Sequence, residues 1–82
     1  MMEWTRADLM GAVHAGVKAH KGRASIRQVA KHIWDNNSKV LQASPALLYT
    51  WQYDMRWAAT KLRHEGVLKP ADDCEKGMWE LA

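Results

Sequence analysis

Several side chains that can contact nucleic acid bases occur in one short stretch of the chain. A glutamine amide can pair with an adenine edge, and an arginine can pair with guanine or a phosphate, so Gln52 and Arg56 are candidates for base reading. The rings of Tyr53 and Trp57 can stack on a base or pack beside its methyl group, and Thr50 opens the same stretch. The alternative for Gln52 and Arg56 is an ordinary polar helix surface.

Positive charge is concentrated in the middle of the chain. Residues 18–63 carry nine lysines and arginines against two aspartates, a net charge of +7, whereas residues 1–17 sum to −1 and residues 64–82 to −3. A basic segment between acidic ends is typical of a polyanion-binding surface, and a merely solvated basic surface is the alternative. The candidate phosphate-binding residues are Arg23, Ser25, Arg27, Lys31, Lys61, Arg63 and Lys76.

These seven residues would not all act in the same way. The cations would supply affinity and register rather than sequence choice. Ser25 lies at a predicted helix N-terminus, where backbone N–H groups can bind a phosphate, although such a serine is more often a simple cap.

The other reactive side chains do not form a catalytic or metal-binding pattern. The four histidines never occur at the i,i+4 spacing that places two ligands on one helix face, and the single cysteine, Cys74, lies in a polar, turn-like segment. The sequence has no glycine-rich phosphate loop and no Ser/His/Asp set. We therefore predict that the chain is not an enzyme and has no catalytic residue, metal site or cofactor.

Length and composition indicate one small domain. The 82 residues are 48% apolar and include five tryptophans, enough for a core without a disulfide. One cysteine fits a reducing compartment, the chain does not open like a signal peptide, and no apolar run approaches the ~20 residues of a membrane span. We expect one domain over residues 1–82, in the cytoplasm, with neither a membrane nor a small-molecule substrate as partner.

Two amphipathic helices are predicted in the first half. The first begins near Thr5 and ends at Gly22, which suits a left-handed exit. The second begins with a capping box, Ser25–Gln28, and ends at the polar residues 35–38. Only a very short extended segment fits between them, at residues 23–24. The predicted apolar face of the first helix is Leu9, Val13, Gly16, Val17 and His20, and that of the second is Ile26, Val29, Ala30, Ile33 and Trp34.

The longest amphipathic pattern lies in the second half and ends at Gly66. It starts either at Pro45 or only near Thr50, and residues 38–44 fit one helical turn against the core. Two short strands, at residues 67–69 and 77–81, then enclose an acidic loop and predict a hairpin. The expected fold is mainly α with a small β-hairpin, in the order of a winged helix-turn-helix with three helices and a wing. The apolar positions of the third helix are Leu48, Trp51, Met55, Ala58, Ala59 and Leu62.

Several residues of the second half resemble one protein family. Arg56-Trp57-Ala58, Leu62, Gly66-Val67-Leu68 and Gly77-Met78-Trp79-Glu80-Leu81 are similar to the N-terminal winged-helix domain of Mrr-type restriction endonucleases, which cut modified DNA. The resemblance implies a DNA-reading domain, standing alone or belonging to a restriction or regulatory system. The nuclease domain of that family has no counterpart in this sequence. The hairpin loop also departs from a DNA-binding wing, because it is acidic and offers only Lys69 and Lys76 as cations.

Two functions remain open at this point. The first is a module that reads duplex DNA, modified or not, through its third helix. The second is a protein-interaction module of the same fold, acting in dimerisation or partner docking, which the acidic loop and Trp57 favour. Trp57 lies opposite the apolar stripe, so it is either covered, with residues 38–49 as the expected cover, or exposed for stacking or a homodimer contact.

Overall fold

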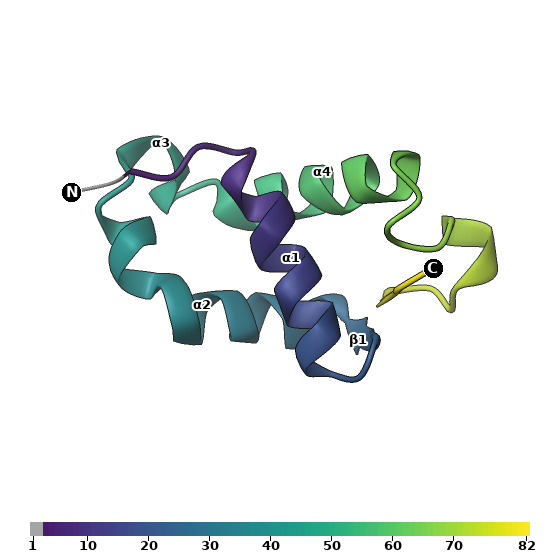
Figure 1. Cartoon of the computed structure of the whole chain (residues 1–82). Coiled ribbons are helices and arrows are strands. Elements are labelled where there is room, and N and C mark those ends of the chain that lie inside the picture. The colour runs from purple at the N-terminus through teal and green to yellow at the C-terminus, as the bar shows by residue number, and fades with distance from the viewer. Residues whose placement is uncertain (1–2) are drawn as a thin grey trace.

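The computed structural model describes residues 3–82, which form four α-helices, one 3₁₀ turn and two short strands. Figure 1 shows α1 crossing α2 and α4, with α3 at one end of the molecule and the C-terminal segment at the other. The fold is therefore mainly helical, as predicted, with a small antiparallel sheet that pairs residues 23–25 with residues 78–80 rather than the two strands of the predicted hairpin. The described residues contain four helices rather than three. In chain order the elements are α1 (Asp8–Ala19), β1 (Arg23–Ser25), α2 (Ile26–Gln42), α3 (Pro45–Leu48), α4 (Trp51–His64), η1 (Ala71–Asp73) and β2 (Met78–Glu80).

Both ends of α1 have a local cause in the sequence. At its start, the Asp8 carboxylate accepts a hydrogen bond from the Thr5 backbone N–H at 2.7 Å and lies at the positive end of the helix. At its end, Lys21 and Gly22 adopt the left-handed conformation, with φ of 61° and 89°. The Gly22 N–H donates to the Val17 carbonyl at 3.0 Å, which terminates the helix and directs the chain into β1.

The predicted start of α2 is confirmed, but its predicted end is wrong. Ser25 and Gln28 form a reciprocal capping box, with hydrogen bonds of 2.8 and 3.0 Å. The helix then continues through the polar residues 35–38 to Gln42. It does so because Leu41 extends the buried side of Val29 and Ile33 by a further two turns, and the side chains at 35–38 lie toward solvent or reach only half burial.

The structure also resolves where the predicted third helix begins. Residues 45–48 form only the single turn of α3, with Pro45 at its first position, and α4 starts at Trp51, the later of the two alternatives. Ser44 stabilises the junction before α3, because its buried hydroxyl accepts from the Trp4 N–H at 2.8 Å and donates to the Val40 carbonyl at 2.6 Å. α4 ends at His64, and the predicted glycine, Gly66, follows with φ of 79° and provides the left-handed exit.

The sheet joins the segment before α2 to the end of the chain. β1 pairs antiparallel with β2, with Arg23 opposite Glu80 and Ser25 opposite Met78. Residues 67–69, predicted as a full strand, form a single bridge between Leu68 and Leu81, supported by the Lys69 N–H donating to the Glu80 carbonyl at 2.8 Å. The ladder is short because Pro70 follows at once and has no N–H to donate. We refer to residues 67–82 as the C-terminal hairpin.

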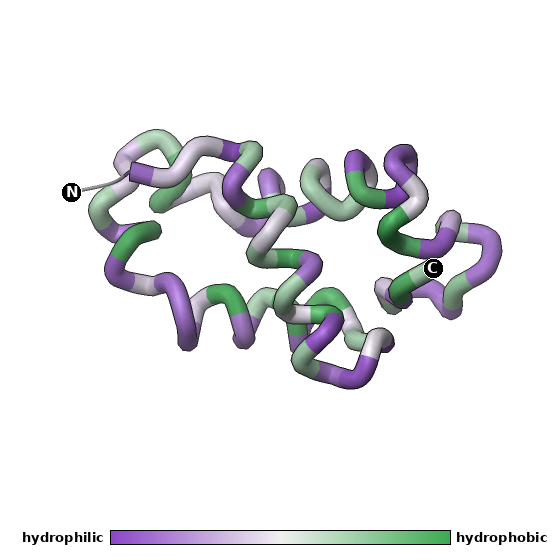
Figure 2. The backbone as a smooth tube through the Cα atoms, viewed as in Figure 1, coloured by the Kyte–Doolittle hydropathy of each residue, from purple (hydrophilic) through white to green (hydrophobic). Residues whose placement is uncertain are grey.

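One apolar core connects all of these elements. Figure 2 shows apolar segments on the inner sides of the helices, whereas hydrophilic segments follow the outer side of α2 and the loop of the C-terminal hairpin. Within residues 3–82, no helix combines the length and the apolar character that a membrane crossing requires. The core residues are Leu9, Ala12, Val13, Val17, Ala24, Val29, Ile33, Leu41, Leu47, Trp51, Met55, Ala58, Ala59, Leu62, Leu68 and Trp79.

Candidate nucleic-acid interface

A groove of about 740 Å³ runs between α2 and α4. Its floor is apolar, formed by Ile26, Ala30 and Met55. α1 packs on a different side of α2, where a Cβ at Gly16 would lie 3.1 Å from Val29, so the first helix leaves the groove open. The residues that line it are Ile26, Arg27, Ala30, Lys31, Trp34, Trp51, Gln52, Met55 and Arg56.

Four of the predicted nucleic-acid ligands meet in this groove. Arg27 and Lys31 come from α2, one turn apart, and Gln52 and Arg56 come from α4, also one turn apart. Within residues 3–82, no ion pair engages either arginine. Lys31 is paired with Asp35 at 2.6 Å, but both side chains are exposed, so the pair contributes little stability and can be exchanged for a phosphate.

An aromatic pair closes one part of the groove. The rings of Trp34 and Trp51 are stacked, with centroids 6.0 Å apart and an interplanar angle of 12°. Trp51 is buried, but Trp34 remains 38% exposed, so its predicted place in the buried stripe of the second helix is wrong. Trp34 also lines the groove together with Arg27 and Lys31 of α2.

The first turns of α4 present two further candidates to solvent. Tyr53 is 79% exposed and lines a small hollow of about 210 Å³ together with Gln52 and Arg56. Thr50 is exposed as well, but its hydroxyl lies 2.8 Å from Asp54 Oδ2 and 3.1 Å from the Ala46 carbonyl. Tyr53 is therefore free to contact a ligand, whereas Thr50 is held by local hydrogen bonds.

Trp57 lies apart from the groove. The Arg6 guanidinium is 4.0 Å from its ring centroid, and the Lys61 ammonium is 5.9 Å from it, both within cation–π range. Trp57 is half-buried and packs on the edge of the core. Residues 38–49 were expected to cover this ring, but the contact on its face comes from Arg6, ahead of α1. Trp57 and Lys61 thus occupy the side of α4 turned away from Gln52 and Arg56.

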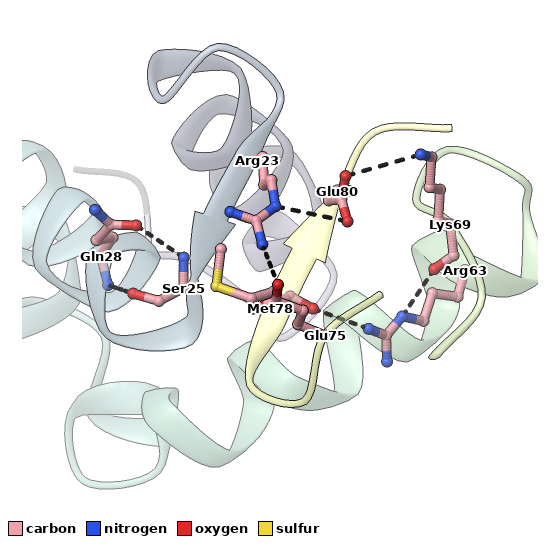
Figure 3. A network of polar contacts seen from close by, with 8 residues as sticks. All are labelled: Arg23, Ser25, Gln28, Arg63, Lys69, Glu75, Met78 and Glu80. Carbon is pink, nitrogen blue, oxygen red and sulfur yellow. Dashed lines mark hydrogen bonds and ion pairs between the residues drawn. The ribbon is translucent and has the colours of Figure 1, made fainter. Parts of the chain in front are cut away.

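Three of the predicted phosphate ligands are held by the fold (Figure 3). Arg63 donates from Nε to the Lys69 carbonyl at 3.1 Å and from Nη2 to the Met78 carbonyl at 3.3 Å. Arg23 lies between two carboxylates, 3.3 Å from Glu75 and 3.8 Å from Glu80. Ser25 is engaged in the capping box of α2. These side chains connect the helices to the C-terminal hairpin.

The C-terminal hairpin carries little free positive charge. Lys69 lies 3.8 Å from Glu80, and Lys76 is exposed near Glu75 in the loop. Asp72 and Asp73 are exposed in η1. The hairpin loop is therefore acidic in the structure as well as in the sequence, and Lys76 lies next to Glu75, close to the start of α2, where the Ile26 N–H donates to the Gly77 carbonyl at 3.0 Å.

Sequence reasoning identified all four polar residues that line the groove but missed the aromatic Trp34. The signal was present, because Arg27, Lys31 and Trp34 follow one another at steps of four and three residues and so share a side of α2. Arg6 was also missed. Its position over Trp57 depends on how the segment before α1 folds back, and no local pattern records that.

Among the described residues, no group of three or more His, Cys, Asp or Glu side chains is arranged to hold a metal ion. His20 and His32 form an edge-to-face pair with centroids 6.5 Å apart, and the His20 Nδ1 lies 2.9 Å from the Gly16 carbonyl. This pair belongs to the contact between α1 and α2.

Comparisons with family models, with curated proteins and with solved structures found no match for this chain. The resemblance to Mrr-type domains therefore stays a prediction.

Proposed function

We propose that this chain is a winged-helix domain that binds duplex DNA, with α4 as its recognition helix. The order of helix, strand, helix, helix and hairpin supports the winged-helix assignment, with α3 as an extra turn in the connection. The antiparallel pairing of β2 with β1, and the bridge from Leu68 to Leu81 on its other side, supports it as well.

The observation that carries this proposal is the set of polar groups around the first two turns of α4. In a helix-turn-helix, residues near the N-terminus of the recognition helix contact base edges in the major groove. Gln52, Tyr53 and Arg56 are exposed at that end of α4. Gln52 pairs with adenine, Arg56 with guanine or a phosphate, and Arg27 and Lys31 contact the adjacent backbone.

The test is a binding titration of a fluorescently labelled duplex of two helical turns. A double variant, Arg27→Gln with Arg56→Gln, removes both unpaired arginines of the groove. We expect its affinity near 0.1 M salt to fall on the order of tenfold or more. The slope of log affinity against log salt should become shallower by ~0.9 for each phosphate that the variant no longer neutralises.

The matched control is Lys18→Gln with Lys39→Gln, which changes the net charge by the same amount. Both lysines are exposed and line none of the hollows around α4. We expect this pair to lower affinity by less than ~3-fold through the overall field alone. Equal losses in the two double variants, or no duplex binding by the parent chain at low salt, would refute the proposal.

A narrower form of the same proposal is that the chain recognises modified DNA and belongs to a restriction or regulatory system. It is supported by the resemblance to Mrr-type domains and by the exposed ring of Tyr53, which can pack beside a methyl group. The measurement compares methylated and plain versions of one duplex. Equal affinity for both would remove this narrower form and leave duplex binding in place.

Self-association is a second candidate function, favoured by charge complementarity within the chain. The exposed acidic residues Asp72 and Asp73 could pair with the basic α2–α4 groove of another copy. Trp57, which favoured a dimer contact at first, is covered by Arg6 and gives this candidate less support. Sedimentation velocity over a wide range of protein concentration tests it, and a single monomeric species throughout would reject it.

A further inference from the structure

We propose that the α2–α4 groove also holds an unpaired nucleotide, with its base stacked on Trp34 and its phosphate bound by Arg27, Lys31 and Arg56. This inference rests on the proposed function, since Arg27, Lys31 and Arg56 belong to both sites. It adds a ligand class that duplex reading does not require. Its sources are a free mononucleotide or an unpaired position in a nucleic acid strand.

The shape of the groove favours such a ligand. Side chains that read a duplex must protrude from the protein surface, and Tyr53, which is 79% exposed, meets this requirement. The groove, in contrast, is a concavity of about 740 Å³ with an apolar floor. That volume lies within the ~300–1,000 Å³ of sites for small organic ligands. A planar base would cover the half-buried side chains of Ile26 and Ala30, which lie in the groove beside the buried Met55.

The chemistry of the walls identifies the ligand as an aromatic ring joined to an anion. Sites for unpaired nucleotides combine a basic groove with aromatic side chains on which bases stack. Trp34 already stacks on Trp51 at 12°, so its orientation is fixed, and its 38% exposure leaves surface for another ring. Arg27 and Arg56 approach from opposite walls, and the weak pair of Lys31 with Asp35 leaves a third cation exchangeable.

Two other parts of the molecule are less suited to this ligand. The hollow beside the C-terminal hairpin, about 270 Å³, is lined by Arg63, which is bound to two carbonyls, and by Glu75, which repels phosphate. Trp57 already has a cation over its ring, and it packs at the edge of the core. Only the α2–α4 groove joins an exposed indole to unpaired arginines within the described residues.

The experiment titrates the full chain with three probes: a single-stranded oligothymidine, a perfect duplex of the same length, and adenosine monophosphate. The readouts are anisotropy of the labelled strands and the indole N–H signals in two-dimensional NMR spectra. Trp34→Leu removes the stacking ring, and Trp34→Phe retains a smaller one. Tyr49→Leu is the matched control, because Tyr49 is 89% exposed and lines none of the hollows. The spectra also show whether each variant is folded.

We expect the oligothymidine to shift the indole signals of Trp34 and Trp51. Trp34→Leu should weaken its binding at least ~5-fold, the lower end for loss of a stacking aromatic, and Trp34→Phe should weaken it less. Tyr49→Leu should leave it unchanged, and Trp34→Leu should change duplex affinity by less than ~2-fold. If adenosine monophosphate binds with the same dependence on Trp34, a free nucleotide is a ligand of the groove. If it does not bind, the ligand is an unpaired position in a nucleic acid strand.

The failures of the two proposals are distinguishable. If the duplex binds but the oligothymidine does not, or binds equally well to Trp34→Leu and Tyr49→Leu, this inference is overturned and the proposed function stands. If neither probe binds, both fall. If Trp34→Leu weakens the duplex as much as the single strand, the groove serves the duplex and the separate nucleotide site is rejected.

Discussion

Arg56 and Arg63 lie on the same side of α4, seven residues apart, but their surroundings give them different roles. Arg56 is exposed at the groove and has no ion pair within the described residues. Arg63 is half-buried and donates to the carbonyls of Lys69 and Met78. The guanidinium is suited to this because its donors form a planar fork that reaches two acceptors at once. The two arginines are equivalent in composition, but in the structure Arg56 is a candidate ligand, whereas Arg63 connects α4 to the C-terminal hairpin.

This difference predicts the effect of Arg63→Lys on stability. A lysine ammonium cannot reproduce both hydrogen bonds from one position, so the free energy of unfolding should fall by roughly 1–3 kcal/mol. Urea denaturation followed by tryptophan fluorescence measures it. At temperatures where the variant is folded, the salt dependence of duplex binding should match that of the parent. A shallower salt dependence with unchanged stability would show instead that Arg63 contacts a phosphate.

At the scale of elements, the crossing of α1 over α2 depends on a glycine. A Cβ at Gly16 would lie 3.1 Å from Cγ1 of the fully buried Val29, whereas a Cβ at Gly11, in the same helix, would meet nothing within 4 Å. Both substitutions to alanine gain the same helix propensity. They differ only in whether the new methyl group has space.

We therefore expect opposite signs from this matched pair. Gly11→Ala should raise the free energy of unfolding by about 0.5–1 kcal/mol, because alanine loses less backbone entropy in a helix. Gly16→Ala should be neutral or destabilising by up to ~2 kcal/mol, because overpacking against a stiff β-branched side chain typically costs ~1–3 kcal/mol. Chemical denaturation of both variants measures the difference. Equal stabilisation by the two would show that the helix crossing has room to adjust.

Local signals in the sequence predicted the helix boundaries that neighbouring residues determine, and missed those that tertiary packing determines. The capping box of Ser25 and Gln28 and the left-handed exits at Gly22 and Gly66 depend on neighbouring residues, and all three are found. The end of α2, by contrast, does not depend on neighbouring residues alone. Residues 35–38 favour a stop, but burial of Leu41 outweighs that preference and extends the helix to Gln42. The predicted strand at residues 67–69 forms only one bridge, between Leu68 and Leu81, because Pro70 follows at once and has no N–H to donate.

The candidate site was predictable in its parts but not in its arrangement. Periodicity alone placed Gln52 and Arg56 on one side of the third helix, and the structure has them there. That they face Arg27 and Lys31 across a groove depends on how α1 holds α2 and α4 in place. Trp34 was missed because its place in the apolar stripe of α2 predicts burial, whereas part of its ring remains exposed.

At the scale of the whole molecule, charge is divided along an elongated shape. The longest dimension is 38 Å, and Figure 1 shows the C-terminal hairpin at the end of the molecule opposite to α3. The acidic loop of the hairpin contains Asp72 and Asp73, while unpaired cations line the α2–α4 groove. A polyanion that docks on α4 would therefore be repelled by the hairpin loop if the two came close. The effect of the loop's negative charge on DNA affinity therefore indicates whether the loop approaches the bound DNA.

The duplex affinity of the double variant Asp72→Asn with Asp73→Asn, measured at two salt concentrations, tests whether the loop approaches the DNA. Both side chains are exposed, so the fold should be unaffected. The Debye length is ~30 Å at 0.01 M salt and ~8 Å at 0.15 M, so a loop held away from the DNA acts on it only at low salt. Because we propose binding led by α4, we expect duplex affinity to rise several-fold at ~0.01 M salt and by less than ~2-fold at ~0.15 M. A gain that persists at the higher salt would place the loop against the phosphates, in which case the C-terminal hairpin would contact DNA as a wing does and Lys76 would become a backbone ligand.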